Sequence, residues 1–407
     1  MIAQIPGLAT TFGVGVGGPM GKNPNINCLL FLLSWLFLFQ PSSCRNSSPY
    51  LLESNHRGNT TYYIGLQTNQ GKEVYDSWFA DTDGRIIYFG QSPFWRAYFA
   101  AKEPDPQGDL REEGDYLIGR FDTEKDTFLA PLKVGHGKAS LLDVLYHTEN
   151  HNVYFTTFFD TMGYVNPNSK RVVYFKGLGA GLNELYQGPG GEIYVTRYSS
   201  AGKSGSVVVI TPSGRLLKEF FIHLPGFIIA PKSIAVSPIT GEMIINTDMF
   251  PLEGDLVRHD TFVLEPDGRV RQRIMAREVF FMSFDRQGKK WVAERSEDGS
   301  WQMSITYPGG KIVSLIIDKK PLPFDVIQDI KHRNAVTIAT AWSGRLYYFE
   351  ENSQGIDFIP LLPETGPGLD ALPKGKGILV YSTMMANNGF LYGAISHGIL
   401  IFKLAPP

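Results

Sequence analysis

A two-strand pattern recurs along most of this chain and constrains its fold more than any other feature. Each copy is a short apolar strand, a tight polar turn and a second apolar strand, as in SWFADTDGRIIYF around Gly84 and LYQGPGGEIYV around Gly191. The other copies centre on His151, Gly241, Gly288, Asn334 and Gly377. Successive turn positions lie 40 to 67 residues apart. Repeats of roughly 40–50 residues with about four strands each are the sequence signature of β-propeller blades.

We therefore predict an all-β chain, a β-propeller of four-stranded antiparallel blades over residues 61–407. Seven copies of the pattern favour seven blades, and six is the alternative because the last copy is irregular. A propeller usually closes by pairing strands from both chain ends in one blade, which removes a free sheet edge. Tyr62–Leu66 is the expected closing strand, beside strands at Ile378–Thr383, Phe390–Ile395 and Ile399–Leu404.

The third copy shows how a single blade reads in sequence. Its four strands are expected at Leu185–Gln187, Ile193–Thr196, Ser206–Thr211 and Arg215–Ile222. Pro212-Ser-Gly214 makes its last hairpin turn, because proline and glycine suit the conformations that tight turns require. Pro266-Asp-Gly268 and Pro308-Gly-Gly310 are the corresponding turns of the fourth and fifth copies.

Composition excludes several classes of protein. The chain has 38 Lys and Arg against 40 Asp and Glu, a formal net charge of -2. Without a basic excess, nucleic acid is not an expected partner. Cys28 and Cys44 are its two cysteines, and both precede the repeats, so no disulfide or cysteine-based metal site is expected in the folded part. We expect a monomer.

Residues 1–44 are interpreted as a targeting segment, with Met20 as a candidate true start. Lys22 precedes the apolar run Cys28–Phe39, whose 12 residues are too short for a membrane span but suit a signal peptide. The chain is therefore expected to be exported, either to the periplasm or by secretion. Cys44 follows small residues, so lipid anchoring at Cys44 is the alternative and the expected route to a membrane. Residues 45–60 have the composition of a linker.

Equivalent positions in the repeats predict a site at one mouth of the central channel. Counting eight residues back from each turn gives the residue entering the innermost strand: Asp76, Asp143, Asn183, Ser233, Phe280, Val326 and Leu369, with Asp325 and Asp370 next to the last two. Counting six forward gives the end of the second strand: Gly90, Thr157, Arg197, Thr247, Glu294, Thr340 and Thr383, with Asp248 next in line. Antiparallel pairing brings both sets to the same end of the blades.

Two long loops are expected to cover this mouth. Gln91–Asp115 contains Phe94 and Trp95, which favours an ordered lid, and Asp248–Asp260 follows a second strand. Long loops in compact folds are usually functional or disordered. We expect Trp95, Phe94, Arg197, Asp248 and Glu294 to contact a ligand.

The phrase LNELYQGPGGEIYVTR, with an asparagine eight residues before the turn glycine, resembles the regucalcin/gluconolactonase family and the wider paraoxonase and strictosidine-synthase-like group of propellers. The resemblance implies a divalent metal, usually calcium, at the channel mouth. By position its ligands would be Asp76, Asp143 and Asn183, with Asp325 or Asp370 as a fourth, and Asp76 or Asp143 would act as the base in lactone or ester hydrolysis. The fifth copy departs from that pattern, because it offers Phe280 where such enzymes carry a polar ligand.

Three functions remain open at this stage. The first is a propeller that binds a small molecule or a protein at the loop-covered mouth, and the second is a calcium-dependent lactone or ester hydrolase. The third is a structural scaffold without catalysis. Short polar residues that open strands also cap backbone N–H groups, so Asp76, Asp143 and Asn183 each have a purely structural alternative. His147 and His151 lie on a predicted hairpin turn, where they do not share a face as they would on a helix, so no metal role is expected for them.

Overall fold

The computed structural model describes residues 50–54, 60–65, 80–91, 113–137, 141–157, 161–199, 204–253, 258–275, 279–284, 287–295, 301–317, 327–333, 336–341, 346–352, 355–360, 380–395 and 398–403. The predictions for the targeting segment, including Met20 and the lipid anchor at Cys44, lie outside these residues. Within them the secondary structure is entirely β, and no helix is long and apolar enough to cross a bilayer.

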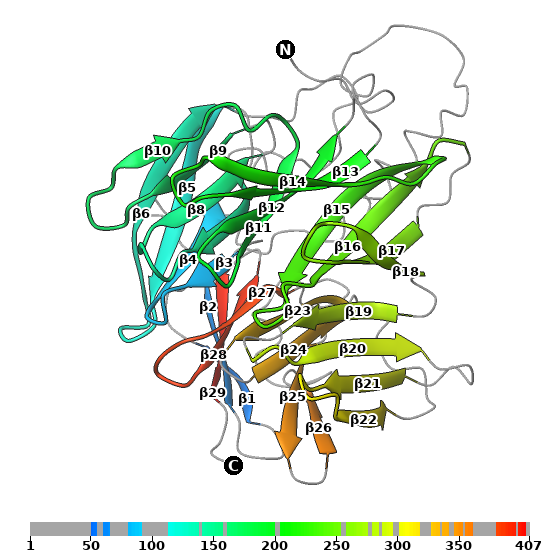
Figure 1. The fold of residues 1–407 in the computed structure, drawn as a ribbon. Helices are drawn as coiled ribbons and strands as arrows, with labels where there is room; N and C mark the ends of the chain where they lie inside the picture. The colour runs from blue at the N-terminus through cyan, green and yellow to red at the C-terminus, as the bar shows by residue number, and fades with distance from the viewer. Residues whose placement is uncertain are drawn as a thin grey trace, which may run out of the picture.

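The described strands form seven antiparallel sheets (Figure 1). From the innermost strand outward, the first three sheets are β3 (Ala80–Thr82), β4 (Ile86–Gln91), β5 (Gly114–Asp122) and β6 (Thr127–Gly137); β7 (Leu141–Tyr146), β8 (Val153–Thr157), β9 (Met162–Val165) and β10 (Val172–Tyr174); and β11 (Leu182–Gln187), β12 (Ile193–Ser199), β13 (Ser204–Ile210) and β14 (Leu216–Ile222). The next three are β15 (Phe227–Val236), β16 (Met243–Pro251), β17 (Arg258–Leu264) and β18 (Val270–Met275); β19 (Val279–Phe284), β20 (Lys290–Arg295), β21 (Trp301–Thr306) and β22 (Ile312–Ile317); and β23 (Ile327–Arg333), β24 (Val336–Ala341), β25 (Leu346–Asn352) and β26 (Gly355–Pro360). The last sheet contains β27 (Val380–Met385), β28 (Leu391–Ile395), β29 (Gly398–Lys403), β2 (Thr60–Gly65) and β1 (Tyr50–Ser54).

The innermost strands of the seven sheets form a closed circle. β3 contacts β7, β7 contacts β11, and the series continues through β15, β19 and β23 to β27, which contacts β3. The sheets are therefore the blades of a propeller, numbered here from the β3–β6 sheet as blade 1 to the β27–β29 sheet as blade 7. The predicted all-β propeller is confirmed, and seven sheets agree with the favoured seven blades.

The ring closes with strands from both ends of the chain, as the sequence predicts. β2 pairs with β29 over its whole length, from Thr60 opposite Lys403 to Gly65 opposite Gly398, and Figure 1 shows the two side by side. β1 then pairs with β2 and adds a fifth strand. β1 lies inside the range 45–60, for which the composition predicts a linker; its residues instead find a pairing partner along the open edge of β2.

The hairpin turns follow the predicted turn chemistry. The third blade has its strands where the sequence places them, and Gly214, Gly268 and Gly310 all have positive φ angles of 84° to 87° in equivalent turns. Each glycine N–H donates to the carbonyl three residues earlier, at 2.8 to 2.9 Å. Aromatic rings of the preceding blade lie over two of these glycines: Phe175 over Gly214 and Phe220 over Gly268. A side chain at either glycine would meet the ring and force a strained backbone.

The hydrophobic core lies between neighbouring sheets and not in one central mass. Between blades 2 and 3, for example, Leu145 and Tyr154 pack with Val195, Val208 and other buried residues. A similar layer joins blades 3 and 4 through Val207 and Ile245. Each blade therefore buries one face against the blade before it and the other against the blade after it, which is why the ring must close to remove its apolar surface from water.

A β-bulge recurs in the innermost strand and changes the predicted register. The pairing of six innermost strands shifts close to their mouth end, between Leu141 and Asp143 in β7 and at corresponding places in β11, β15, β19, β23 and β27. Asp143 pairs with Thr156 and Ser233 with Asn246, whereas Asn183 lies inside the bulge between Leu182 and Leu185. Asn183 is therefore not equivalent to Asp143, because the bulge of β11 contains a different number of residues from the bulge of β7.

The seventh copy needs a second correction. The hairpin between β27 and β28 turns at Asn387–Gly389, not at Gly377, which lies outside the described residues. Thr383 consequently pairs with Gly393 inside the innermost strand and does not end the second strand.

Candidate functional site

Several of the predicted site residues lie outside the described part of the chain. These are Asp76, Phe94, Trp95, Asp325 and Asp370. Glu294 lies in β20, opposite Val279, and the structure describes its backbone alone. The predicted set can therefore be placed in space for Asp143, Asn183, Arg197 and Asp248.

Asp143 uses both carboxylate oxygens to bind backbone N–H groups. Its Oδ1 accepts from the N–H of Val144 and its Oδ2 accepts from the N–H of Leu185, both at 2.7 Å. Leu185 belongs to β11, so this buried carboxylate, 6% exposed, ties the innermost strand of blade 2 to that of blade 3. This contact is the structural alternative that the sequence left open for Asp143.

Two other short polar residues make similar links between blades. Asp81 in β3 accepts from the N–H of Thr82 at 2.7 Å and from the N–H of Tyr146 in β7 at 2.9 Å. Asn183 in β11 donates from Nδ2 to the Pro231 carbonyl in β15 at 3.5 Å. The counting rule missed Asp81 because it lies next to the turn and not at the mouth. Recurrent short polar side chains on these strands thus serve to join successive blades.

Thr156 links Asp143 to Asn183, and the described residues around them form no metal site. Thr156, which pairs with Asp143, donates from Oγ1 to the Asn183 carbonyl at 2.6 Å. Nowhere in the described residues do three or more His, Cys, Asp or Glu side chains group in a way that could hold a metal ion. Any calcium ligand set would have to include side chains outside that part of the chain.

Arg197 is committed to a network inside its own blade. Its Nη1 donates to the Leu178 carbonyl at 2.9 Å, its Nε donates to Ser206 Oγ at 3.2 Å, and its Nη2 pairs with Glu219 of β14. Burial lowers the pKa of Arg197 from its usual value, without a change of charge at neutral pH. The guanidinium therefore fixes the outer strand of blade 3 through Glu219.

Asp248 also has a partner in its own blade. It lies in β16, where its buried Oδ2 is 2.7 Å from the Nζ of Lys232 in β15. Lys232 is half-exposed, so this ion pair lies at the surface of blade 4. Arg197 and Asp248 thus occupy different blades, and the structure does not join them in one ligand site.

His147 occupies the hairpin turn at the opposite end of the blades. It is fully buried, and its Nε2 lies 2.7 Å from the Gly191 carbonyl in the corresponding turn of blade 3. Its Nδ1 accepts from the N–H groups of Glu149 and Asn150. Donation by Nε2 and acceptance by Nδ1 describe a neutral imidazole that joins two turns.

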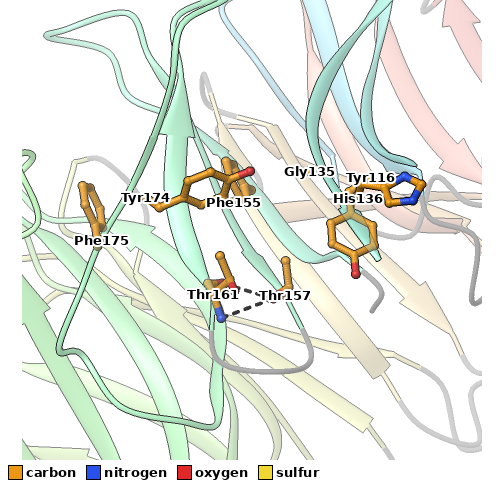
Figure 2. Close-up of a pocket in the computed structure, with 8 residues that line it drawn as sticks. All are labelled: Tyr116, Gly135, His136, Phe155, Thr157, Thr161, Tyr174 and Phe175. Carbon is orange, nitrogen blue, oxygen red and sulfur yellow. Dashed lines mark hydrogen bonds between the residues drawn. The ribbon is translucent and has the colours of Figure 1, made fainter. Parts of the chain in front are cut away.

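The described residues do form a cleft at the mouth end, between blades 1 and 2 (Figure 2). Its volume is about 330 Å³, and its lining residues are Tyr116, Gly135, His136, Phe155, Thr157, Thr161, Tyr174 and Phe175. Figure 2 shows Tyr116 and His136 on the blade 1 side and Phe155 and Tyr174 on the blade 2 side, with the His136 ring pointing away from blade 2. The cleft opens on the face where the second strands end, because Thr157 is the last residue of β8.

Aromatic rings supply the walls of the cleft. Tyr174 is 47% exposed, and its ring meets the Phe155 ring edge-on with 6.1 Å between centroids. Its hydroxyl donates to the Val134 carbonyl of β6, which anchors the ring across the gap between the two blades. A Cβ on Gly135 would lie 2.8 Å from the Tyr116 ring, so the glycine makes room for that ring.

Polar groups are confined to the floor and the rim. The Thr157 N–H donates to the Thr161 carbonyl, Thr157 Oγ1 accepts from the Thr161 N–H, and both residues line the cleft. At the rim, Asp115 Oδ1 binds both Lys133 Nζ at 2.6 Å and His136 Nδ1 at 2.7 Å. These two hydrogen bonds, that of Lys133 first, lower the pKa of Asp115. The cleft is thus bordered by aromatic rings, and polar atoms make up at least as much of its lining as apolar atoms.

Sequence reasoning missed this cleft for an identifiable reason. Its walls come from the two outer strands of blade 1 and from β8 to β10 of blade 2. The counting rule follows the innermost hairpin of each blade, whose spacing is regular, and Thr157 is the one lining residue that it includes. The available signal was four aromatic residues in or just after outer and middle strands: Tyr116, Phe155, Tyr174 and Phe175.

Comparison with known proteins supports the fold and leaves the family open. No family model matches the sequence, and no curated protein matches it. A chain from the crystal structure of the mitotic checkpoint complex superposes over 97% of this chain and 98% of its own, with a TM-score of 0.52 and 9% identity. The Dos1 propeller superposes over 85% of this chain and 96% of its own, with a TM-score of 0.46 and 10% identity. At 9% identity the first similarity concerns the fold alone, and it is the closed ring of seven sheets that makes this chain a β-propeller.

Proposed function

We propose that this chain is a binding propeller that takes an apolar group, from a small molecule or a partner protein, into the cleft between blades 1 and 2. The observation that carries the proposal is the aromatic slot of about 330 Å³ on the mouth face. Ligand pockets are typically concave and mostly apolar, with a few polar groups that fix orientation. Here the exposed ring of Tyr174 and the partly exposed ring of Tyr116 would provide the aromatic contact, and Thr161 would provide a hydrogen bond.

The size of the cleft limits what it can bind. A volume of about 330 Å³ is at the small end of ligand pockets, which range over roughly 300–1,000 Å³. Burying one large apolar side chain contributes about 1.5–3 kcal/mol. That contribution alone gives weak binding, so a tight complex would need further contacts on the mouth face. These numbers favour an anchoring pocket for one side chain of a protein partner over a pocket that encloses a whole metabolite.

The calcium-dependent hydrolase, which the resemblance to the regucalcin and paraoxonase group suggested, has less support. Asp143 gives both oxygens to backbone N–H groups, and a carboxylate used in this way has fewer lone pairs left for a metal. The hydroxyls of Thr157 and Tyr174, which line the cleft, donate to backbone carbonyls and not to a base. The proposal therefore describes a binding function without catalysis. A scaffold without any pocket is disfavoured by the exposed ring of Tyr174 at the cleft.

The proposal also includes export from the cytoplasm, because the apolar run Cys28–Phe39 with Lys22 before it is typical of a signal peptide. The partner or small molecule would then be met outside the cytoplasm.

Saturation-transfer NMR with indole and p-cresol as probes tests the cleft. We expect transfer to both probes in the wild-type protein. Tyr174→Ala removes an aromatic wall, and Thr161→Trp places a large ring in the cleft, so either substitution should abolish the transfer. Leu252→Ala is the matched control, because Leu252 is a similarly exposed apolar side chain on blade 4. Equal transfer in all four proteins would show that the probes bind elsewhere and would overturn the proposal.

A further inference from the structure

The outermost strand of blade 3 has features that the cleft does not explain. β14 (Leu216–Ile222) is at the end of its sheet and pairs only with β13 among the described strands. Three of its apolar side chains are exposed: Phe221 at 60%, Leu216 at 51% and Leu217 at 44%. We propose that the open edge of β14 is a second binding surface, which takes an extended acidic segment of a partner protein as an added strand. The surface is separate from the cleft and does not depend on it.

Other outer strands are protected against such pairing. An exposed sheet edge presents unpaired N–H and C=O groups, and proteins usually guard it with short strands, charges, proline or bulges. β10 has three residues, β6 contains Pro131 and two irregularities, and β18 carries the polar run Arg271–Arg273. β14 also carries Lys218, Glu219 and one register shift, but its pairing is regular from Lys218 to Ile222 and three of its apolar side chains are exposed.

The pairing of β14 with β13 shows which side chains share a face. Leu216 pairs with Ile210, Glu219 with Val208 and Phe221 with Ser206, and these lie on the face toward blade 2. Lys218 and Phe220 lie on the other face, toward blade 4. The register shifts at Leu217, so the regular edge runs from Lys218 to Ile222. An added strand would therefore meet Phe221 on one face and Lys218 on the other.

The charges beside this edge identify the kind of partner. Lys176, Arg215 and Lys218 are exposed and make no ion pair with any described residue. Lys176 is close to β14 because its neighbour Phe175 packs on Gly214, at the turn that leads into the strand. The acid on β14, Glu219, is already paired with Arg197. A partner with carboxylates would supply the missing negative charge, whereas a second copy of this chain would bring like charges together.

The matching segment would alternate apolar and acidic residues. Alternate side chains of a strand point to opposite faces, so apolar residues would lie beside Phe221 and Leu216 while acidic residues lie beside Lys218. Main-chain hydrogen bonds would give affinity, and the alternation would give specificity, as in other cases of strand addition.

The probe is a fluorescein-labelled peptide of alternating valine and glutamate, measured by fluorescence anisotropy against the full chain. We expect binding that weakens as salt rises, because the exposed charges are screened. Lys218→Glu and Phe221→Lys should each weaken binding by about tenfold. Ile312→Lys, at an apolar edge residue of blade 5 that is 63% exposed, is the matched control and should bind like wild type. Tyr174→Ala in the cleft should also leave the affinity unchanged, which separates this proposal from the previous one.

Four results would overturn the inference. A peptide N-methylated at alternate amides that binds equally well would exclude strand pairing. A valine–lysine peptide that binds equally well would exclude charge recognition. If the protein binds phosphatidylserine vesicles, loses this binding in Lys218→Glu and does not bind the acidic peptide, the β14 edge would be a membrane-binding surface instead. A dimer in sedimentation experiments that Phe221→Lys dissociates, again without peptide binding, would identify self-association.

Discussion

Replacing Asp143 by asparagine separates the two roles that this carboxylate has been given. In the structure both oxygens accept backbone N–H groups at 2.7 Å, one from its own strand and one from Leu185 in the next blade. Asparagine keeps one acceptor oxygen but turns an NH2 group toward the other N–H. A hydrogen bond to a charged group contributes roughly 1.5–3 kcal/mol, and an unsatisfied buried donor adds a penalty of similar size.

We therefore expect Asp143→Asn to lower the free energy of unfolding by about 2–3 kcal/mol. Urea unfolding followed by tryptophan fluorescence measures this loss, in EDTA and again in millimolar calcium. The account predicts the same loss in both, because backbone N–H groups are the partners of Asp143. The control is Asp267→Asn, at an exposed turn where the carboxylate accepts from the Arg269 N–H at 3.0 Å, and it should cost less than about 1 kcal/mol.

The refuting result is a calcium-dependent one. Suppose that Asp143→Asn is as stable as Asp267→Asn in EDTA, and that calcium raises the stability of the wild type but not that of Asp143→Asn. Asp143 would then be a metal ligand. The hydrolase hypothesis would then regain its basis, and turnover of a lactone and arylester panel would follow as its direct test.

Three further predictions concern stability and export. Tyr392→Phe removes a buried phenol that bonds to a carbonyl of blade 1, and should cost about 1–2 kcal/mol in urea unfolding, whereas an unchanged midpoint would contradict the contact. Burial raises the pKa of Tyr392 to about 12, so the stability that this phenol contributes is present below about pH 10 and is lost as the pH rises toward 12. Titration of tyrosine absorbance should therefore show one phenol that ionises at a higher pH than exposed tyrosines do. The hydrogen bond from Arg85 lowers the pKa of buried Asp122, so the stability that Asp122 contributes is present above about pH 4 and is lost as the pH falls below that. In Asp122→Asn the free energy of unfolding should therefore fall less steeply between pH 4 and lower pH than in the wild type. An unchanged pH dependence would contradict this role of Asp122. If Cys28–Phe39 belongs to a signal peptide, mass spectrometry of exported protein should find a mature chain that starts after the run, and an intact cytoplasmic chain would exclude export.

The fold was predictable because its signal is local. Each hairpin pattern is contained in about a dozen residues, and its repetition alone implies a ring that strands from both termini close. The turn glycines Gly214 and Gly268 were predictable for the same reason, since the conformation that they adopt is accessible to few other residues. Sequence could not show the bulges of the innermost strands, because a bulge depends on which partner residue a strand finds and not on the strand alone.

The site was less predictable, and the same cause explains it. A fixed count from the turn makes Asp143 and Asn183 equivalent, but the bulge in β11 separates them by one position. The cleft is formed by outer strands, and residues such as Tyr116 and Tyr174 come together only because blades 1 and 2 pack side by side. Contacts between blades have no period in the sequence, so composition and spacing do not reveal them.

Closure of the ring between β2 and β29 is the central structural claim, since the cleft and the β14 edge both require blades fixed about one axis. Cysteines at Tyr63 and Leu400, which face each other in this pairing, test it most directly in a chain whose Cys28 and Cys44 are replaced by serine. The account predicts an intramolecular disulfide, seen as faster migration on a non-reducing gel, and a higher urea midpoint than in the reduced protein. A matched pair at Tyr63 and Asp357 in β26 should not form one. Absence of the Tyr63–Leu400 disulfide, or its formation only between molecules, would contradict the closed ring.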